Sequence, residues 1–183
     1  MKRLLIGLLA AATLTACGET ATEPLSSTSP TQTVVTGSTL SARPAPAIPT
    51  RLRLATVDAP VVPVALTGTA LVPPQDPLVL GWWGRKAGAA HGVTLLVGHT
   101  VHTGGGKLDN LEDVPVGSIA RVSGVRYQVT SVQVISKAAL AERSSRLFAQ
   151  SGPHRLVIVT CEDYDPATGD YASNVVVTAS RTR

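Results

Sequence analysis

Aromatic residues are scarce in this chain: two Trp, three Tyr and one Phe stand among 183 residues. A β domain this poor in aromatics needs its few large rings for packing, so Trp82 and Trp83 are expected to serve as core and groove wall. The chain also lacks a large excess of side chains of one charge sign. Without Lys2 and Arg3, the 16 basic side chains fall to 14, against 12 acidic ones. This balance argues against a nucleic-acid partner, because proteins that bind nucleic acid carry a basic stripe.

Several catalytic motifs are missing as well. The sequence contains no Gly-x-Ser-x-Gly elbow and no His-Glu-x-x-His, so serine-hydrolase and zinc-protease chemistry have no basis. The run Gly104-Gly105-Gly106-Lys107 is not a phosphate loop, because Val101 replaces the first glycine and Leu108 replaces the magnesium-binding Ser or Thr. We expect this run to be a flexible loop.

The N-terminus has an apolar run, but one too short to span a bilayer stably. Two basic residues precede the run from Leu4 to Leu14, which has the length of a secretory signal core. The segment Leu14-Thr15-Ala16-Cys17 resembles the bacterial lipobox, in which the cysteine is lipidated and becomes the first residue. The resemblance implies a signal peptide over residues 1–16 and a lipid anchor on Cys17, at the extracytoplasmic face of the membrane. The alternative is a plain secretory signal, with Cys17 as an incidental thiol.

Residues 17–50 are predicted to form a tether. Between Gly18 and Thr50, 18 of 33 positions are Ser, Thr or Pro. Such a segment buries too little apolar surface to offset the entropy lost on ordering. We expect an extended linker that holds a single domain, residues 51–183, away from the membrane.

The domain is predicted to be mostly β. Short apolar stretches alternate with Gly and Pro, which favours a barrel or a sandwich. The predicted strands are 51–57, 60–66, 94–97, 118–122, 125–134, 155–161 and 171–179. Ser123-Gly124 is predicted to form a hairpin turn. One helix is predicted over 137–150, because good helix formers run up to Ser151-Gly152-Pro153, and a short helical turn is predicted around 108–113.

Cys161 and His99 are the candidate catalytic pair. Cys161 closes the apolar run Leu156-Val157-Ile158-Val159, and His99 follows Gly98, sixty-two positions upstream of the cysteine. A thiol is an effective nucleophile only as the thiolate, which a neighbouring imidazole stabilises. The end of a buried strand would also place it rigidly. Taken alone, each residue has a plainer interpretation: Cys161 as a small buried apolar residue, and His99 as a hydrogen-bonded residue at a strand end.

A zinc site is the other chemistry that these residues could support. His99, His102 and Cys161 could supply three ligands, but no closely spaced Cys or carboxylate pair completes a tetrahedral set. We therefore expect no metal and no other cofactor. His91 and His102 are expected at the surface or in a groove.

Four stretches of the sequence carry a family resemblance. They are Gly81-Trp82-Trp83-Gly84, Leu95-Leu96-Val97-Gly98-His99-Thr100, Leu156-Val157-Ile158-Val159-Thr160-Cys161, and Gly169-Asp170-Tyr171 leading to Asn174-Val175-Val176-Val177. Together they resemble the sortases, and they are most similar to the class F sortases of actinobacteria. The order agrees too, since sortases place His before Cys. The resemblance implies a mostly β fold: an eight-stranded barrel with one or two short helices and the active site in a groove at one side.

The same resemblance implies a cell-surface cysteine transpeptidase. Cys161 would attack a sorting motif similar to Leu-Pro-x-Thr-Gly and hold the peptide as an acyl-thioester, which an amine then resolves. His99 would protonate the leaving amine and deprotonate the incoming one. Thr160, Trp82 and Trp83 would contact the substrate. The implied partners are exported proteins with a C-terminal sorting motif and an amine acceptor such as a peptidoglycan precursor, and the protein is expected to be a monomer.

One element of the family is missing from the sequence. Sortases carry an arginine on the last strand, facing the cysteine, where this chain has Asn174. An amide can donate a hydrogen bond to an oxyanion, but it lacks the charge and the fork of arginine. Arg181 lies seven residues on, too far along a strand to replace it. Other arginines could reach in from elsewhere: Arg85, Arg126 and Arg155. The missing arginine keeps open an alternative, a non-catalytic sortase-like barrel that binds sorting-signal peptides or cell-wall components.

Overall fold

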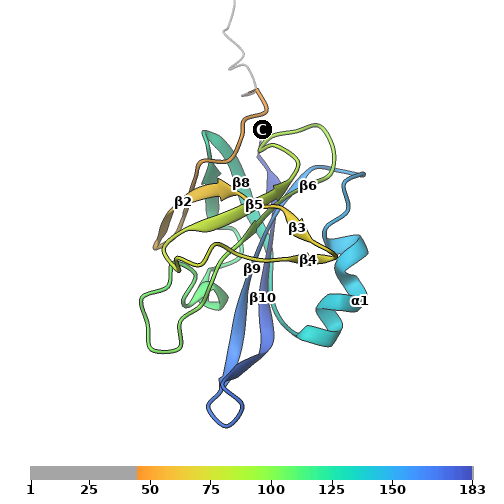
Figure 1. Ribbon diagram of the computed structural model, residues 1–183. Helices are drawn as coiled ribbons and strands as arrows, with labels where there is room; N and C mark the ends of the chain where they lie inside the picture. The colour runs from red at the N-terminus through yellow and green to blue at the C-terminus, as the bar shows by residue number, and fades with distance from the viewer. Residues whose placement is uncertain (1–44, 183) are drawn as a thin grey trace, which may run out of the picture. The chain divides into compact units, whose positions relative to one another are not determined.

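The computed structural model describes residues 45–182, which form a β-barrel with one α-helix (Figure 1). The barrel strands are β1 (Arg51–Leu54), β2 (Val57–Pro63), β5 (Leu80–Gly84), β6 (Val93–Val97), β7 (Ile119–Val122), β8 (Val125–Ser136), β9 (Arg155–Asp165) and β10 (Asp170–Arg181). The remaining elements are β3 (Leu66–Thr67), β4 (Ala70–Leu71), the 3-10 helix η1 (Leu111–Asp113) and α1 (Lys137–Leu147). The mostly β, eight-stranded barrel expected from the sequence is confirmed. The predicted signal peptide, Cys17 and most of the predicted tether lie outside the described residues.

The barrel closes in the order β1-β2-β5-β6-β9-β10-β8-β7. Most neighbours are antiparallel, but β2 pairs with β5 and β6 pairs with β9 in parallel. The strands β3 and β4 form a separate two-stranded sheet. Within residues 45–182, no helix is both long enough and apolar enough to cross a membrane.

Some element boundaries differ from those expected. The predicted strand 51–57 is interrupted, because Ala55 takes a φ of 49° and the chain turns so that Leu54 pairs with Val57. Ser123-Gly124 forms the predicted hairpin turn, with φ angles of 46° and 83°. The helix starts as predicted, with the Ser136 side chain accepting a hydrogen bond from the Ala139 N–H at 3.1 Å. It ends at Leu147 rather than at residue 150.

Residues 93–97 of β6, 156–160 of β9 and 174–177 of β10 are buried on both faces, which explains why these segments are mostly apolar. On β9, Leu156 and Ile158 pack inside the barrel. The alternate residues, Val157 and Val159, belong to a second cluster outside it, against which Leu140 of α1 packs. Because side chains alternate along a strand, Cys161 follows Val159 onto this outer face. The thiol of Cys161 therefore lies next to Val159 on the same face of β9 as the outer cluster.

The strand connections contain a glycine that the barrel requires. Gly84 has a φ of 88°, and a Cβ there would lie 2.6 Å from the Val93 carbonyl oxygen. That oxygen accepts a hydrogen bond from the Arg85 N–H at 2.8 Å, so it cannot move freely. Gly124 has a similar φ of 83° but nothing within 4 Å of the same position. The two glycines therefore differ in crowding and not in backbone conformation.

We predict that Gly84→Ala destabilises the protein more than Gly124→Ala. Backbone strain should cost each variant about 1–2 kcal/mol of unfolding free energy. Gly84→Ala should lose about 1–3 kcal/mol more, because its methyl group meets a fixed carbonyl. Urea titration of both variants beside the unmodified protein measures the difference. Equal losses would mean that the close approach at Gly84 carries no cost.

Candidate active site

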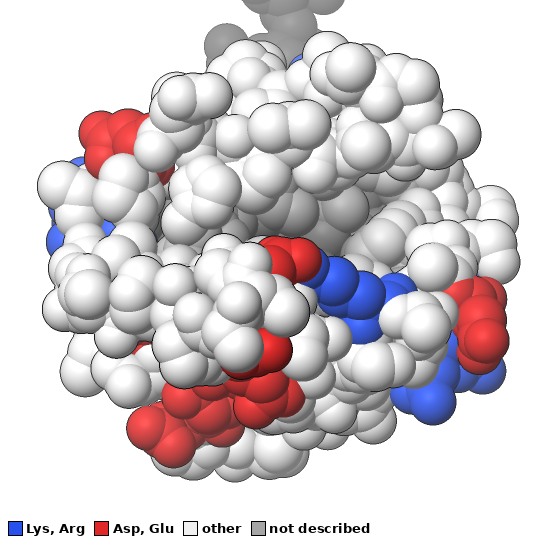
Figure 2. Space-filling view, turned by 60° about the horizontal axis from the view of Figure 1, so that its bottom comes forward, with Lys and Arg blue, Asp and Glu red and all other residues white. Residues whose placement is uncertain are grey.

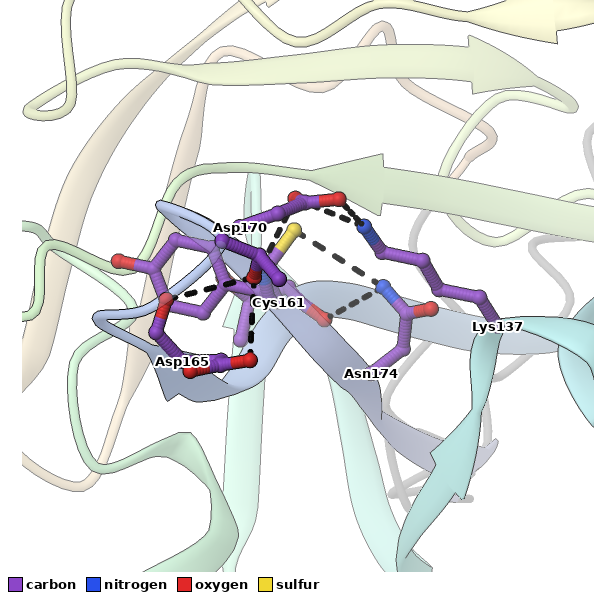
Figure 3. Close-up of polar contacts among 8 residues, drawn as sticks. Lys137, Cys161, Asp165, Asp170 and Asn174 are labelled. Atoms are coloured by element: carbon purple, nitrogen blue, oxygen red, sulfur yellow. Dashed lines mark hydrogen bonds and ion pairs between the residues drawn. The ribbon is translucent and has the colours of Figure 1, made fainter.

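Cys161 lies on β9 directly opposite Asn174 on β10. The Asn174 Nδ2 donates a hydrogen bond to the Thr160 carbonyl at 3.1 Å and lies 4.0 Å from the Cys161 sulfur (Figure 3). Asn174 is 8% exposed and Cys161 is partly buried. The structure thus brings together the cysteine and the position at which the sequence lacks an arginine. The amide is held in place facing the sulfur.

His99 follows the end of β6, beside β9. The last pair between these parallel strands is Val97 with Val159, and the Gly98 N–H donates to the Val159 carbonyl at 3.2 Å. Two further residues in this register bring His99 level with Cys161. In the part of the chain that the structure describes, no hydrogen bond joins the His99 ring to the thiol. Such a bond commonly shortens only when substrate binds.

Thr160 holds the backbone on both sides of His99. Its hydroxyl donates to the Gly98 carbonyl at 3.0 Å and lies 2.7 Å from the Thr100 hydroxyl. Thr160 is 2% exposed. Its position therefore fixes the histidine segment against β9, in addition to lining the pocket described next.

A pocket of about 500 Å³ opens at Cys161. Figure 2 shows a hollow in one face of the molecule, with uncharged walls and side chains of both charges meeting at its edge. Its walls are formed by β3 and β4 with the residues that follow, the outer faces of β5, β6 and β9, and α1, and they include Leu71, Trp83, Leu95, Val97, Leu140 and Phe148. Trp83 thus lies where substrate contact was expected. Trp82 instead packs against the barrel core and donates its Nε1–H to the Arg85 carbonyl at 3.0 Å.

The charged groups that act on the thiol are Lys137 and Asp170. Burial raises the pKa of Cys161 above its ordinary value, whereas the Lys137 ammonium lowers that pKa and the Asp170 carboxylate raises it. Lys137 Nζ lies 2.8 Å and 2.7 Å from the two carboxylate oxygens of Asp170. Since burial dominates, the resting thiol is protonated at neutral pH. The sequence gives no sign that Lys137 belongs to the site. Its position depends on the pairing of β8 with β10 and of β10 with β9.

The arginines considered as replacements are held elsewhere. Arg85 donates to the Gln150 carbonyl at 2.9 Å, and Arg155 donates to the carbonyls of Arg146 and Leu147 at the end of α1. Arg181 donates to the Gly88 carbonyl at 2.5 Å. Arg126 lies near the start of β8, whereas Ile135, the residue level with Asn174, lies near its end.

The loop that follows His99 is anchored by aromatic side chains. The His102 ring stacks on Tyr164 with centroids 3.8 Å apart, and Tyr164 meets Tyr171 edge to face at 5.3 Å. The Tyr171 hydroxyl donates to the Thr100 carbonyl at 2.8 Å and accepts from the His102 N–H at 3.0 Å. The first part of this loop is therefore fastened to β9 and β10, before the glycine run over residues 104–106.

Two carboxyl groups meet at the end of the barrel near Cys161. Burial raises the pKa of Glu112, and the charge and hydrogen bonding of Glu162 raise it further. The Glu112 Oε2 is buried and has no hydrogen-bond partner within residues 45–182. Over the same residues, no group of three or more His, Cys, Asp or Glu side chains is placed to hold a metal ion. The two carboxyl groups therefore repel each other when both are ionised.

The barrel, the uncharged pocket and a cysteine that lines it place the chain among β-barrel proteins that present a thiol from a barrel strand. The chain belongs to the sortase family, because residues 50–182 match the sortase domain. Sortases are cysteine transpeptidases of the extracytoplasmic side of the membrane, and they act on proteins with sorting motifs.

Solved structures of sortases share this fold. SrtA sortase from Actinomyces oris is 15% identical with a TM-score of 0.54, over 73% of this chain and 79% of that chain. Listeria monocytogenes sortase A is 12% identical with a TM-score of 0.54, over 75% and 88%. Sortase C-1 from Actinomyces oris is 19% identical with a TM-score of 0.53, over 73% and 71%. A comparison with curated proteins gives no match.

We predict that alkylation of Cys161 has a midpoint pH above that of an ordinary thiol. Burial disfavours the thiolate in the folded protein, so unfolding should lower the midpoint. The measurement is the rate of reaction with iodoacetamide against pH, followed by intact mass. Cys17→Ser in the full chain makes Cys161 the single thiol, and the same chain in urea is the control. A folded midpoint below the urea midpoint would contradict the electrostatics derived above.

We predict that Glu112→Gln stabilises the protein near pH 7 but not near pH 4. A carboxyl whose folded pKa is raised favours folding while it is protonated, and that contribution is lost as the pH rises through the folded pKa. Gln resembles the protonated form at every pH. Its melting temperature should therefore exceed that of the unmodified protein by a few degrees near pH 7 only. Glu142→Gln, on the exposed face of α1, is the matched control and should show no such pH dependence.

Proposed function

We propose that this protein is a sortase-type transpeptidase that cleaves a sorting motif similar to Leu-Pro-x-Thr-Gly and transfers the peptide to an amine. The observation that supports this most is the parallel register of β6 and β9, which sets the His99 segment beside Cys161 at the mouth of the pocket. Family membership supports it independently. An uncharged pocket of this kind suits the apolar Leu and Pro side chains of such a motif.

The chemistry is assigned to three side chains. His99 takes the Cys161 proton, and the thiolate attacks the peptide carbonyl to form a tetrahedral oxyanion. When the carbon–nitrogen bond breaks, His99 gives a proton to the leaving amine, and an acyl-thioester remains on Cys161. The incoming amine loses its proton to His99 and displaces the thiol. The Asn174 amide, 4.0 Å from the sulfur, donates a hydrogen bond to the oxyanion.

The enzyme is proposed to be anchored outside the cell membrane, where it meets its protein substrates and the acceptor amine. Residues 1–16 are a signal peptide, Cys17 carries the lipid, residues 17–50 are the tether and 51–183 the catalytic domain. The protein is a class F sortase, anchored as a monomer at the extracytoplasmic face of the membrane. Its partners are exported proteins with a C-terminal sorting motif and an acceptor amine such as a peptidoglycan precursor. It uses no metal or other cofactor and binds no nucleic acid.

Two observations favour a second candidate function. The site lacks the last-strand arginine, and burial keeps the thiol protonated at neutral pH. Both features suit a barrel that binds sorting-signal peptides or wall components without turning them over. The two functions differ in whether a covalent adduct forms.

We predict that the full chain carrying Cys17→Ser gains the mass of the N-terminal part of a Leu-Pro-x-Thr-Gly peptide and that an added amine discharges it. Cys161→Ala should form no adduct. His99→Ala should slow adduct formation by about a hundredfold or more, since a general acid–base is worth that much. Intact-mass spectrometry follows both steps. A protein whose thiol alkylates normally but accepts no peptide of this type would be the binding barrel.

A further inference from the structure

Lys137 occupies a particular place beside the active site. It is the first residue of α1, directly after the end of β8, and Ser136 caps the helix behind it. On neighbouring strands, Ile135 of β8 pairs with Asn174 of β10, and Asn174 pairs with Cys161. Lys137 therefore starts two residues beyond the row that contains the thiol. Figure 3 shows its side chain extending back toward Asp170 and Cys161.

Asp170 is the ion-pair partner of the Lys137 side chain. Both carboxylate oxygens contact Lys137 Nζ, at 2.8 Å and 2.7 Å, and Oδ1 also accepts from the Tyr171 N–H at 2.8 Å. The backbone hydrogen bond anchors the carboxylate at the start of β10. The two side chains are 47% and 69% exposed. An exposed ion pair of this kind is weak, at about 0–1 kcal/mol, so the lysine can exchange its partner readily.

The other ionisable groups around Cys161 leave Lys137 as its cation. On β9 itself, the neighbouring Glu162 interacts with Glu112 at the end of the barrel. His99 follows β6, and the proposed chemistry uses it to move the proton. From β10 the thiol faces the neutral Asn174 amide, the Asp170 carboxylate and the Tyr171 phenol, and from α1 it faces Lys137.

We propose that Lys137 is the positive charge of this active site: its ammonium pairs with Asp170 while Cys161 is protonated, and it pairs with the sulfur when the thiolate forms. This inference rests on the proposed function only in taking Cys161 as the nucleophile. The thiol proton passes to His99, and Lys137 keeps its own protons throughout. The lysine supplies charge, and the Asn174 amide supplies a directed hydrogen bond. Together they divide between two residues the charge and the donor of the arginine that the sequence lacks.

The test uses two variants that break the same ion pair but change the charge in opposite directions. Lys137→Met removes the positive charge near the sulfur, and Asp170→Asn removes the negative one. The readout is the alkylation rate of the full chain carrying Cys17→Ser, at a pH below the thiol midpoint. Lys137→Met should react about threefold or more slowly, because the thiolate fraction falls further than its nucleophilicity rises. Asp170→Asn should react faster.

Two controls separate charge from structure. Lys137→Arg keeps the charge and should react within about twofold of the parent chain, since guanidinium stays protonated. Lys86→Met removes an exposed lysine far from Cys161 in the sequence and should leave the rate unchanged. Loss of rate in both Lys137→Met and Asp170→Asn would indicate a structural ion pair and overturn the inference. So would an unchanged rate in Lys137→Met.

This readout does not depend on peptide turnover. If no peptide adduct forms but the two variants shift alkylation in opposite directions, the transpeptidase proposal fails and the lysine inference stands. If adducts form and Lys137→Met alkylates as the parent chain does, the lysine inference fails and the transpeptidase proposal stands.

Discussion

The parallel pairing of β6 with β9 is the constraint on which the site depends. Five consecutive pairs, from Val93 with Arg155 to Val97 with Val159, set where the end of β6 lies along β9. Over most of these pairs both strands are buried on both faces, so a shift of one residue would exchange the side chains of the barrel core with those of the outer cluster. The Thr160 hydroxyl then fixes the backbone beyond the last pair. The position of His99 relative to Cys161 is thus a consequence of core packing.

The same packing creates an electrostatic problem. Cys161 continues the outer face of β9 that Val157 and Val159 bury, so it is partly removed from water and its pKa rises. A nucleophile in this place needs a nearby positive charge, and a lysine on the adjacent helix can supply it without entering the apolar pocket. Its own helix forms one wall of that pocket through Leu140. Under the proposed function, substrate binding and thiol activation would therefore involve the same short helix.

Strands and turns that depend on neighbouring residues could be predicted from the sequence. Contacts that depend on the tertiary fold could not. Continuous apolar runs identified β6 and β9, and the Ser123-Gly124 pair identified the turn before β8. Strand β5 was missed as a strand, because Gly81-Trp82-Trp83-Gly84 has neither alternation nor β-branched residues. Lys137 was missed for a different reason. Nothing in its local sequence distinguishes it from any lysine at the start of a helix, and only the pairing of β8, β10 and β9 brings it to the thiol.

The exposure of the Lys137–Asp170 pair has a consequence for when the lysine acts. Water screens both of these exposed charges, so the ammonium offsets only part of the cost that burial places on the thiolate. A peptide lying over Cys161 would exclude that water and strengthen every remaining charge interaction. The attraction between ammonium and sulfur would then increase just as the carbonyl arrives. A resting thiol that is protonated, and so protected from adventitious electrophiles, is consistent with an enzyme activated by its own substrate.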